Sequence, residues 1–334
     1  MIVRLTTFFV VVSLSTALAA STRPNGGLKA IEYGARGDGH GQVLAAGLNS
    51  WNTPDAVAVT SDGAVWFRET LTWHPRIARF APDGSFREYV VPDPAGLSYG
   101  DSRAFVAAGN AVLFGPLVRS AAGWQIRRIS ERGEVDWAAA PGCIVGGVTF
   151  ACFPGHRGDP THTVGLDDVT SVTRGPRGDI WFTSERASLI GRVTAGGVRT
   201  VFTRGLTRWD SGPQFITTGP DGNMWFTEKR DRIGRITQDG RITEFSNGIP
   251  RRASLGAIVA GRDGNLWFTL YHGMVMGRIT IGGRVRLYHD LVYPSSGHED
   301  DPLSMLVTDA AGRLYYNEGQ AGRIARLTIP ADSQ

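Results

Sequence analysis

Apolar and polar positions follow one pattern that recurs along the chain. Each copy has a glycine turn and then alternating apolar residues ending in two large side chains, as in GPRGDIWFTS (175–184), GPDGNMWFTE (219–228) and GRDGNLWFTL (261–270). Self-similarity at a fixed period indicates one structural unit repeated along the chain. The second large residue recurs every 42 to 48 residues, apart from one interval of 68, at Phe67, Phe114, Phe182, Phe226, Phe268 and Tyr316.

Each unit has a second half that is as regular as the first. IGRITQDGRITEF (233–245) and LIGRVTAGGVRTVF (189–202) alternate apolar and polar residues around an Asp-Gly or Gly-Gly pair. Alternation of period two with β-branched and aromatic residues around such a pair indicates a hairpin. One unit is therefore predicted to be four short antiparallel strands, named here a to d. Units of this size and make-up are typical of β-propeller blades.

The repeats predict an all-β fold, a β-propeller of four-stranded antiparallel blades. The sixth blade has no strand d of its own, but residues 28–33 match the end of strand d elsewhere. The N- and C-terminal strands are therefore expected to pair and close the ring, which removes an exposed sheet edge. A seventh blade has room only at 138–168, which has no WF-type segment and is interpreted as an inserted loop. The six blades counted lie at about 53–90, 101–138, 168–203, 212–246, 255–289 and 303–329.

The first twenty residues have the layout of a secretory signal peptide. Arg4 supplies positive charge, residues 8–14 are apolar, and residues 17–19 form a small-x-small cleavage site. The apolar stretch is too short to span a bilayer comfortably. We expect residues 1–20 to be removed and residues 21–334 to form one domain of a secreted or periplasmic protein.

Export also bears on Cys143 and Cys152, the two cysteines of the chain. Exported proteins meet oxidising conditions, so a disulfide between them is expected. A reactive thiol or a metal-bound pair is the alternative, although the segment has no metal-ligand spacing.

The charge balance is nearly even, with 35 Lys and Arg against 31 Asp and Glu. Such a small excess calls for neither a nucleic-acid nor a membrane partner, and we expect a monomer once the signal peptide is cleaved. A residue type repeated at one place of the unit is first a structural feature, so the strand-c arginines are expected to brace neighbouring blades or to solvate one face. These are Arg79, Arg128, Arg192, Arg235, Arg278 and Arg326.

Propeller geometry decides which residues can meet. Strand a begins and strand b ends on one face of the ring, named here the mouth, and the glycine turns lie on the other face. Glu69, Glu228 and Glu318 end strand b in three blades. Carboxylate oxygens suit a hard cation such as Mg²⁺, or alternatively Ca²⁺, so these glutamates are candidate metal ligands. The alternative is that each lies in water or pairs with a neighbouring arginine.

Other mouth residues are candidates for contact with a substrate. Some begin strand a, one histidine lies in the b–c connection of the fifth blade, and another lies in the loop that enters the sixth. Histidine titrates near neutrality and can act as a general base, although a loop histidine is commonly just exposed to solvent. The candidates for catalysis are His298, His272 and Gln214, and those for substrate binding are Asp55, Ser304 and Asp301.

The segment GPDGNMWFTEKRDRIGRITQDGRITEF (219–245) resembles the repeat of the virginiamycin B lyase (streptogramin lyase) family, and the likeness recurs in five or six units. The resemblance implies a seven-bladed propeller in which glutamates at strand ends bind magnesium. It also implies a histidine base that opens a cyclic depsipeptide antibiotic by elimination at its ester. On this resemblance Glu228, with Glu69 and Glu318, corresponds to the family's glutamate.

The chain departs from the family where the base is expected. The family's histidine begins strand a in a Pro-His-Gly-Ile context, and the corresponding residues here are Gln214, Asp55 and Ser304. Glutamine cannot accept a proton as imidazole does, so His298 or His272 would have to supply the base. The prediction is a lyase-like propeller that acts on a small cyclic ester or lactone. A gluconolactonase-like hydrolase and a non-catalytic binding propeller are the alternatives.

Overall fold

The described part of the chain is built from β-strands, as the repeats predict. No helix in this part is long and apolar enough to cross a membrane. The computed structural model describes residues 23–25, 28–34, 54–69, 76–83, 85–91, 105–120, 123–140, 143–145, 148–150, 170–194, 198–206, 212–271, 275–288, 305–309, 311–318 and 323–328.

Five antiparallel sheets of four strands each follow one another along the chain in the predicted order a-b-c-d. The first blade contains β3 (Pro54–Val59), β4 (Val65–Glu69), β5 (Arg76–Phe80) and β6 (Phe86–Val90). The second contains β7 (Phe105–Ala108), β8 (Ala111–Ser120), β9 (Gly123–Ile129) and β10 (Val135–Ala140). The third contains β13 (Ser171–Arg174), β14 (Ile180–Ser184), β15 (Leu189–Val193) and β16 (Arg199–Phe202).

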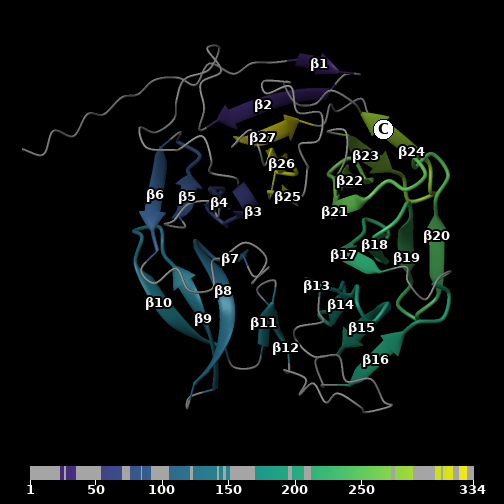
Figure 1. Ribbon diagram of the computed structural model, residues 1–334, viewed down its shortest axis with the longest axis horizontal. Helices are drawn as coiled ribbons and strands as arrows, with labels where there is room; N and C mark the ends of the chain where they lie inside the picture. Colours follow the sequence, from purple (N-terminus) through teal and green to yellow (C-terminus); the bar gives the residue numbers. More distant parts are fainter. Residues whose placement is uncertain are drawn as a thin grey trace, which may run out of the picture.

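The fourth and fifth blades have the same order. The fourth contains β17 (Pro213–Thr218), β18 (Met224–Glu228), β19 (Ile233–Ile236) and β20 (Ile242–Phe245). The fifth contains β21 (Leu255–Ala260), β22 (Leu266–Leu270), β23 (Met276–Ile279) and β24 (Val285–Tyr288). Figure 1 shows the sheets side by side in a ring, and strands a of neighbouring blades pack on each other.

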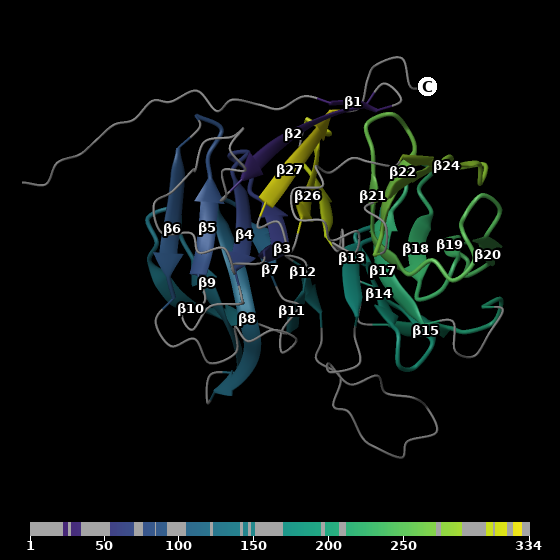
Figure 2. The ribbon, with the colours of Figure 1, turned by 45° about the horizontal axis from the view of Figure 1, so that its top comes forward.

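The sixth sheet joins the two ends of the chain, as predicted. Its C-terminal part consists of β25 (Leu306–Thr308), β26 (Leu314–Glu318) and β27 (Arg323–Thr328). Strand β2 (Leu28–Gly34) pairs with β27 and supplies strand d, with Tyr33 opposite Ile324. Strand β1 (Arg23–Asn25) adds a fifth strand beside β2, and Figure 2 shows both near the C-terminal strands.

The stretch predicted to be an inserted loop contains a small hairpin. Strands β11 (Cys143–Val145) and β12 (Val148–Phe150) form a separate two-stranded sheet. Figure 1 shows this hairpin between the second and third blades, so part of the insertion occupies a place in the ring. The rest of the insertion lies outside the described residues.

The core lies between blades, and the paired aromatics of strand b explain how. Successive side chains of a strand point to opposite faces. Trp225 therefore packs with Leu266 and Phe268 of the fifth blade, while Phe226 packs with Trp181 of the third. The same pairing of one blade's Trp with the next blade's apolar strand b recurs around the sheets. Thus no blade buries its own aromatics alone.

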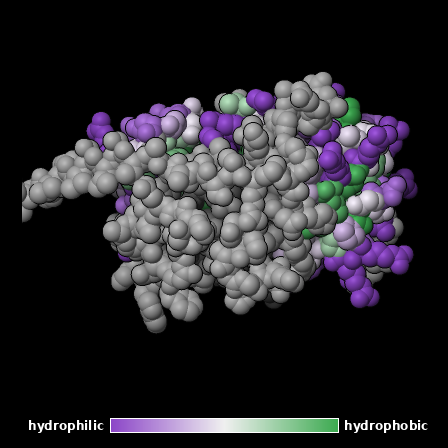
Figure 3. All heavy atoms as spheres, turned by 90° about the horizontal axis from the view of Figure 1, so that it is seen from above, coloured by the Kyte–Doolittle hydropathy of each residue, from purple (hydrophilic) through white to green (hydrophobic). Residues whose placement is uncertain are grey.

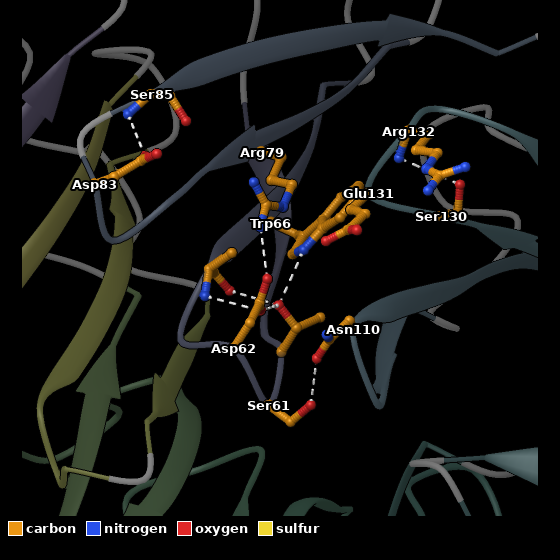
Figure 4. A network of polar contacts seen from close by, with 12 residues as sticks. Ser61, Asp62, Trp66, Arg79, Asp83, Ser85, Asn110, Ser130, Glu131 and Arg132 are labelled. Carbon is orange, nitrogen blue, oxygen red and sulfur yellow. Dashed lines mark hydrogen bonds and ion pairs between the residues drawn. The ribbon is translucent and has the colours of Figure 1, made fainter.

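In most blades the tryptophan of strand b also has a polar partner. In the first blade, Arg79 donates to Asp62 at 2.5 Å and lies over the Trp66 ring, as Figure 4 shows. In the fourth, the Trp225 indole N–H donates to Asp221 Oδ1 at 2.9 Å, and Arg235 lies over the ring. In the first blade the Trp66 indole N–H donates to Thr60 Oγ1 instead, at 3.1 Å. A buried indole N–H that lacks an acceptor costs free energy, so an acceptor in or beside the a–b turn stabilises the packing in both blades.

Two of the strand-c arginines also brace the neighbouring blade, as predicted. Arg192 donates to the carbonyl of Gln238, and Arg235 donates to the carbonyl of Ile281, each at 3.1 Å. Arg128 behaves differently because its blade has Leu113 opposite it in place of tryptophan. It is half exposed and pairs with Asp136 on its own sheet.

The same packing requires a glycine at one position of strand c. Gly234 lies opposite Phe226, and a Cβ there would overlap the phenyl ring. Gly191 and Gly277 lie under Phe182 and Phe268 in the same way. On the outside, apolar side chains are few. The space-filling view is mostly hydrophilic where residues are described, and the exposed large apolar side chains there are Val198, Val201 and Ile281.

Replacing Asp221 with alanine should destabilise the fold. The change removes the acceptor of the Trp225 indole N–H and of the Asn223 side chain. Leaving buried donors unpaired costs about 2–3 kcal/mol. Chemical denaturation should show this loss, whereas Asp239→Ala, in the exposed c–d turn of the same blade, should lose well under half as much. Equal losses would show that the indole contact contributes nothing specific.

Candidate functional site

The predicted site residues divide into three groups. Gln214 and Glu228 are described in full. Asp55, Glu69 and Glu318 are placed on strands β3, β4 and β26 by their backbones alone, as is Cys143 on β11. The other candidates lie outside the described residues and stay predictions: His298, His272, Ser304, Asp301 and Cys152.

Strand a is irregular where it begins at the mouth. The register shifts between Pro213 and Ile216 in the fourth blade, and between Leu255 and Ile258 in the fifth. The first blade has the same shift beside Asp55. A β-bulge re-aims side chains and is common beside functional sites. The positions expected to face a substrate, including Asp55 and Gln214, thus lie in bulges.

Threonines of strand b hold these bulges from the preceding blade. Thr227 Oγ1 donates to the carbonyl of Gly256 at 2.8 Å, and Thr183 Oγ1 donates to the carbonyl of Gln214. Both threonines are fully buried. The threonine of the WFT segment therefore fixes the start of the next blade's strand a, which lies at the mouth.

A polar cluster joins the third and fourth blades at the mouth. Glu185 accepts a hydrogen bond from Gln214 Nε2 at 3.0 Å and pairs with Lys229 Nζ at 2.7 Å. Gly212 packs against both charged side chains, and its carbonyl accepts from the Lys229 backbone. Gln214 Oε1 is buried and has no hydrogen-bond partner among the described residues. The cluster offers a carboxylate, an ammonium and a free amide acceptor.

Glu228 lies in a different environment. It is 1% exposed, and its carboxyl is close enough to Glu244 on β20 for a hydrogen bond between the two. Arg232 pairs with Glu244 at 2.8 Å, and both side chains are largely shielded from water. Glu228 Oε1 has no hydrogen-bond partner in the described part of the chain. Its neighbours are therefore a second carboxyl and a guanidinium.

Burial and like charge act together on this carboxyl. Burial is the largest effect and disfavours the ionised form, and the charge and hydrogen bond of Glu244 act in the same direction. The charge of Arg232 acts against them. Together they raise the pKa of Glu228 to about 8. At neutral pH the pair therefore favours a hydrogen bond in which Glu228 keeps its proton.

The surroundings of Glu228 do not fit a cation site. Strands β4 and β26, which carry Glu69 and Glu318, belong to neighbouring blades, whereas β18, which carries Glu228, lies across the ring in Figure 1. Among the described residues no group of three or more acidic, histidine or cysteine side chains could hold a metal ion. Arg232 also places a positive charge beside Glu228.

Two members of the mouth cluster were not predicted from the sequence. Glu185 lies one position out of register with the strand-b glutamates, and Lys229 follows Glu228 directly. The sequence singles out Lys229 in one respect: it is one of only two lysines in a chain whose other basic residues are arginines. Their contact runs between blades, which no spacing within one repeat can show.

The comparisons agree with the repeat pattern. Residues 159–333, just over half of the chain, match the model of the Virginiamycin B lyase family. The chain is similar to the crystal structure of a virginiamycin B lyase from Staphylococcus aureus, at 22% identity and TM-score 0.50, over 91% of this chain and all of the other. A protein assigned as a gluconolactonase is similar at 14% identity and TM-score 0.53, over 93% and 97%. No match was found among the curated proteins.

Glu228→Gln should flatten the dependence of stability on pH. A pKa raised in the folded state means that the neutral carboxyl stabilises the fold fully below about 4.5, and that this contribution falls as pH rises through about 8. Between pH 5 and pH 8 the native chain should lose about 1–3 kcal/mol relative to the glutamine variant. Denaturant unfolding at several pH values measures it. The exposed control Glu131→Gln should keep the native slope, and a native slope in Glu228→Gln would contradict the buried pair.

Proposed function

This chain belongs to the virginiamycin B lyase family, and we propose that it opens a small cyclic ester or lactone at the mouth as a carbon–oxygen lyase. One observation supports the proposal most strongly. This member of the family has a polar cluster at the mouth, where strand a begins with a β-bulge. Gln214 presents an unpaired buried amide oxygen there, beside the charged pair of Glu185 and Lys229.

The reaction is an elimination that needs no water. A base removes the proton from the carbon next to a carbonyl, the neighbouring carbon–oxygen bond of the ester breaks, and a carbon–carbon double bond forms. The released oxygen leaves as a carboxylate, and the proton stays on the base until it is exchanged. The product therefore has the mass of the substrate. In our proposal His298 or His272 supplies the base, since Gln214 cannot.

The cluster is assigned to binding in this proposal. Gln214 Oε1 accepts a hydrogen bond from an N–H of the ligand, which favours a ring that contains amides as well as the ester. Lys229, which is largely exposed, donates to a ligand carbonyl. Asp55, Ser304 and Asp301 complete the substrate contacts. Glu185 holds Gln214 and Lys229 in place through its hydrogen bond and its ion pair.

A non-catalytic binding propeller is the second candidate. It is favoured by one observation: the position of the family's histidine is Gln214, and its amide is tied to Glu185. Such a chain would bind the same class of ring without turning it over. In either case we propose that residues 1–20 are a signal peptide and that the mature chain is secreted or periplasmic. N-terminal sequencing of the exported protein tests this point.

Incubation of the mature chain with a type B streptogramin, followed by liquid chromatography and mass spectrometry, tests the proposal. We expect a product of unchanged mass, and a gain of one water would identify hydrolysis instead. A parallel incubation with chelator tests whether a part of the chain outside the described residues supplies a metal. Binding without any product would favour the second candidate, and neither binding nor product would remove this substrate class.

Gln214→Ala and Lys229→Ala should each raise KM about tenfold, because each removes one hydrogen bond to the ligand. His298→Ala or His272→Ala should instead lower kcat, by about 100-fold or more for the one that is the base. Arg241→Ala, at an exposed turn on the opposite face, is the matched control and should leave both constants unchanged. Unchanged KM in both cluster variants would show that the ligand binds elsewhere.

A further inference from the structure

Three positions of each blade share one face near the mouth. In the fourth blade Phe226 pairs with Gly234, and Gly234 pairs with Glu244. Glu228 is two residues after Phe226, and Arg232 is two residues before Gly234, so alternation puts all three on the same face. The contacts among Glu228, Arg232 and Glu244 agree with this register.

The first blade has the same three residue types in the same register. Glu69 pairs with Arg76 across β4 and β5, and Glu88 lies opposite Ala78, two residues further along. Arg76 pairs with Glu88 at 3.1 Å, as Arg232 pairs with Glu244. The Glu–Arg–Glu set of the fourth blade is thus repeated on the far side of the ring (Figure 1).

The sixth blade repeats the set across the joined ends of the chain. Glu318 pairs with Arg323 across β26 and β27. On β2, Glu32 lies opposite Ala325, which is two residues after Arg323. The strand-d glutamate therefore comes from the N-terminal strand. The register is the same as in the other two blades although strand d is contributed by a distant part of the sequence.

The other three blades have none of the three charges. The fifth has three apolar residues at these positions, and all three pack in one hydrophobic cluster with its strand b. The third blade has uncharged residues there. In the second blade strand b bulges between Phe114 and Val118, so that Val118 lies opposite Gln125, and the residues are again uncharged. The sets are Leu270, Val275 and Leu287 in the fifth blade, Ser184, Leu189 and Val201 in the third, and Val118, Gln125 and Trp137 in the second.

We infer that the strand-b glutamates belong to an all-or-none Glu–Arg–Glu set that ties strand b to strand d within one blade, and that they are not ligands of a cation. A buried charge that loses its partner is costly, whereas exchanging the whole set for apolar residues is tolerated. That asymmetry explains why the three ionisable residues occur together or not at all. Ligands of one ion would need to converge and would not require an arginine in each blade.

An exchange between blades tests the inference. Arg232→Val alone leaves Glu228 and Glu244 buried without a cation, and should lower the apparent Tm by about 4 °C or more. Adding Glu228→Leu and Glu244→Leu copies the set of the fifth blade and should recover more than half of that loss. Arg241→Val, at an exposed turn of the same blade, is the control and should change the Tm by about 1 °C or less.

A titration with MgCl2 and CaCl2 provides an independent readout. The native chain and the triple variant should show the same heat of binding and the same change in Tm with cation concentration. A Tm rise with Mg²⁺ that the triple variant or Glu228→Gln loses would overturn the inference. So would a triple variant that melts no higher than Arg232→Val or does not fold. None of these readouts depends on turnover, so the proposed function can fail while this inference holds, and the reverse.

Discussion

The tryptophan of strand b is the side chain on which the rest of the structure depends. A four-stranded sheet exposes two faces, and this tryptophan buries one of them against the next blade. Burial leaves the indole N–H in need of an acceptor, which the aspartate of the a–b turn supplies in the fourth and fifth blades. Stacked arginines then connect that turn to a neighbouring blade. Packing, hydrogen bonding and blade order thus meet in one repeated unit.

Because the core lies between blades, the mouth is also built between blades. Threonines of one strand b hold the bulged start of the next strand a. The cluster of Glu185, Gln214 and Lys229 likewise spans the third and fourth blades. The buried set around Glu228 lies within one blade and is shielded from water. We therefore propose that ligand binding and blade stability depend on different acidic residues at the same end of the sheets.

Much of the fold could be predicted from the sequence, because alternation and period specify strands, faces and blade size. The pairing of residues 28–33 with the last strand was predicted from a short likeness to strand d and is present. The site was less predictable. Alternation places Glu228 at a strand end, but it does not say that Glu244 and Arg232 are its partners. Contacts between repeats, such as that of Glu185 with Lys229, leave no mark in the spacing of either repeat.

A crystal structure of the mature protein grown with MnCl2, with anomalous scattering recorded for manganese, would show whether the strand-b glutamates bind a cation. Manganese takes the same oxygen ligands as magnesium, and its position can be seen without ambiguity. We expect no manganese peak at Glu69, Glu228 or Glu318, with Arg232 still paired to Glu244 beside Glu228. A manganese ion coordinated by Glu228, with Arg232 displaced, would contradict it.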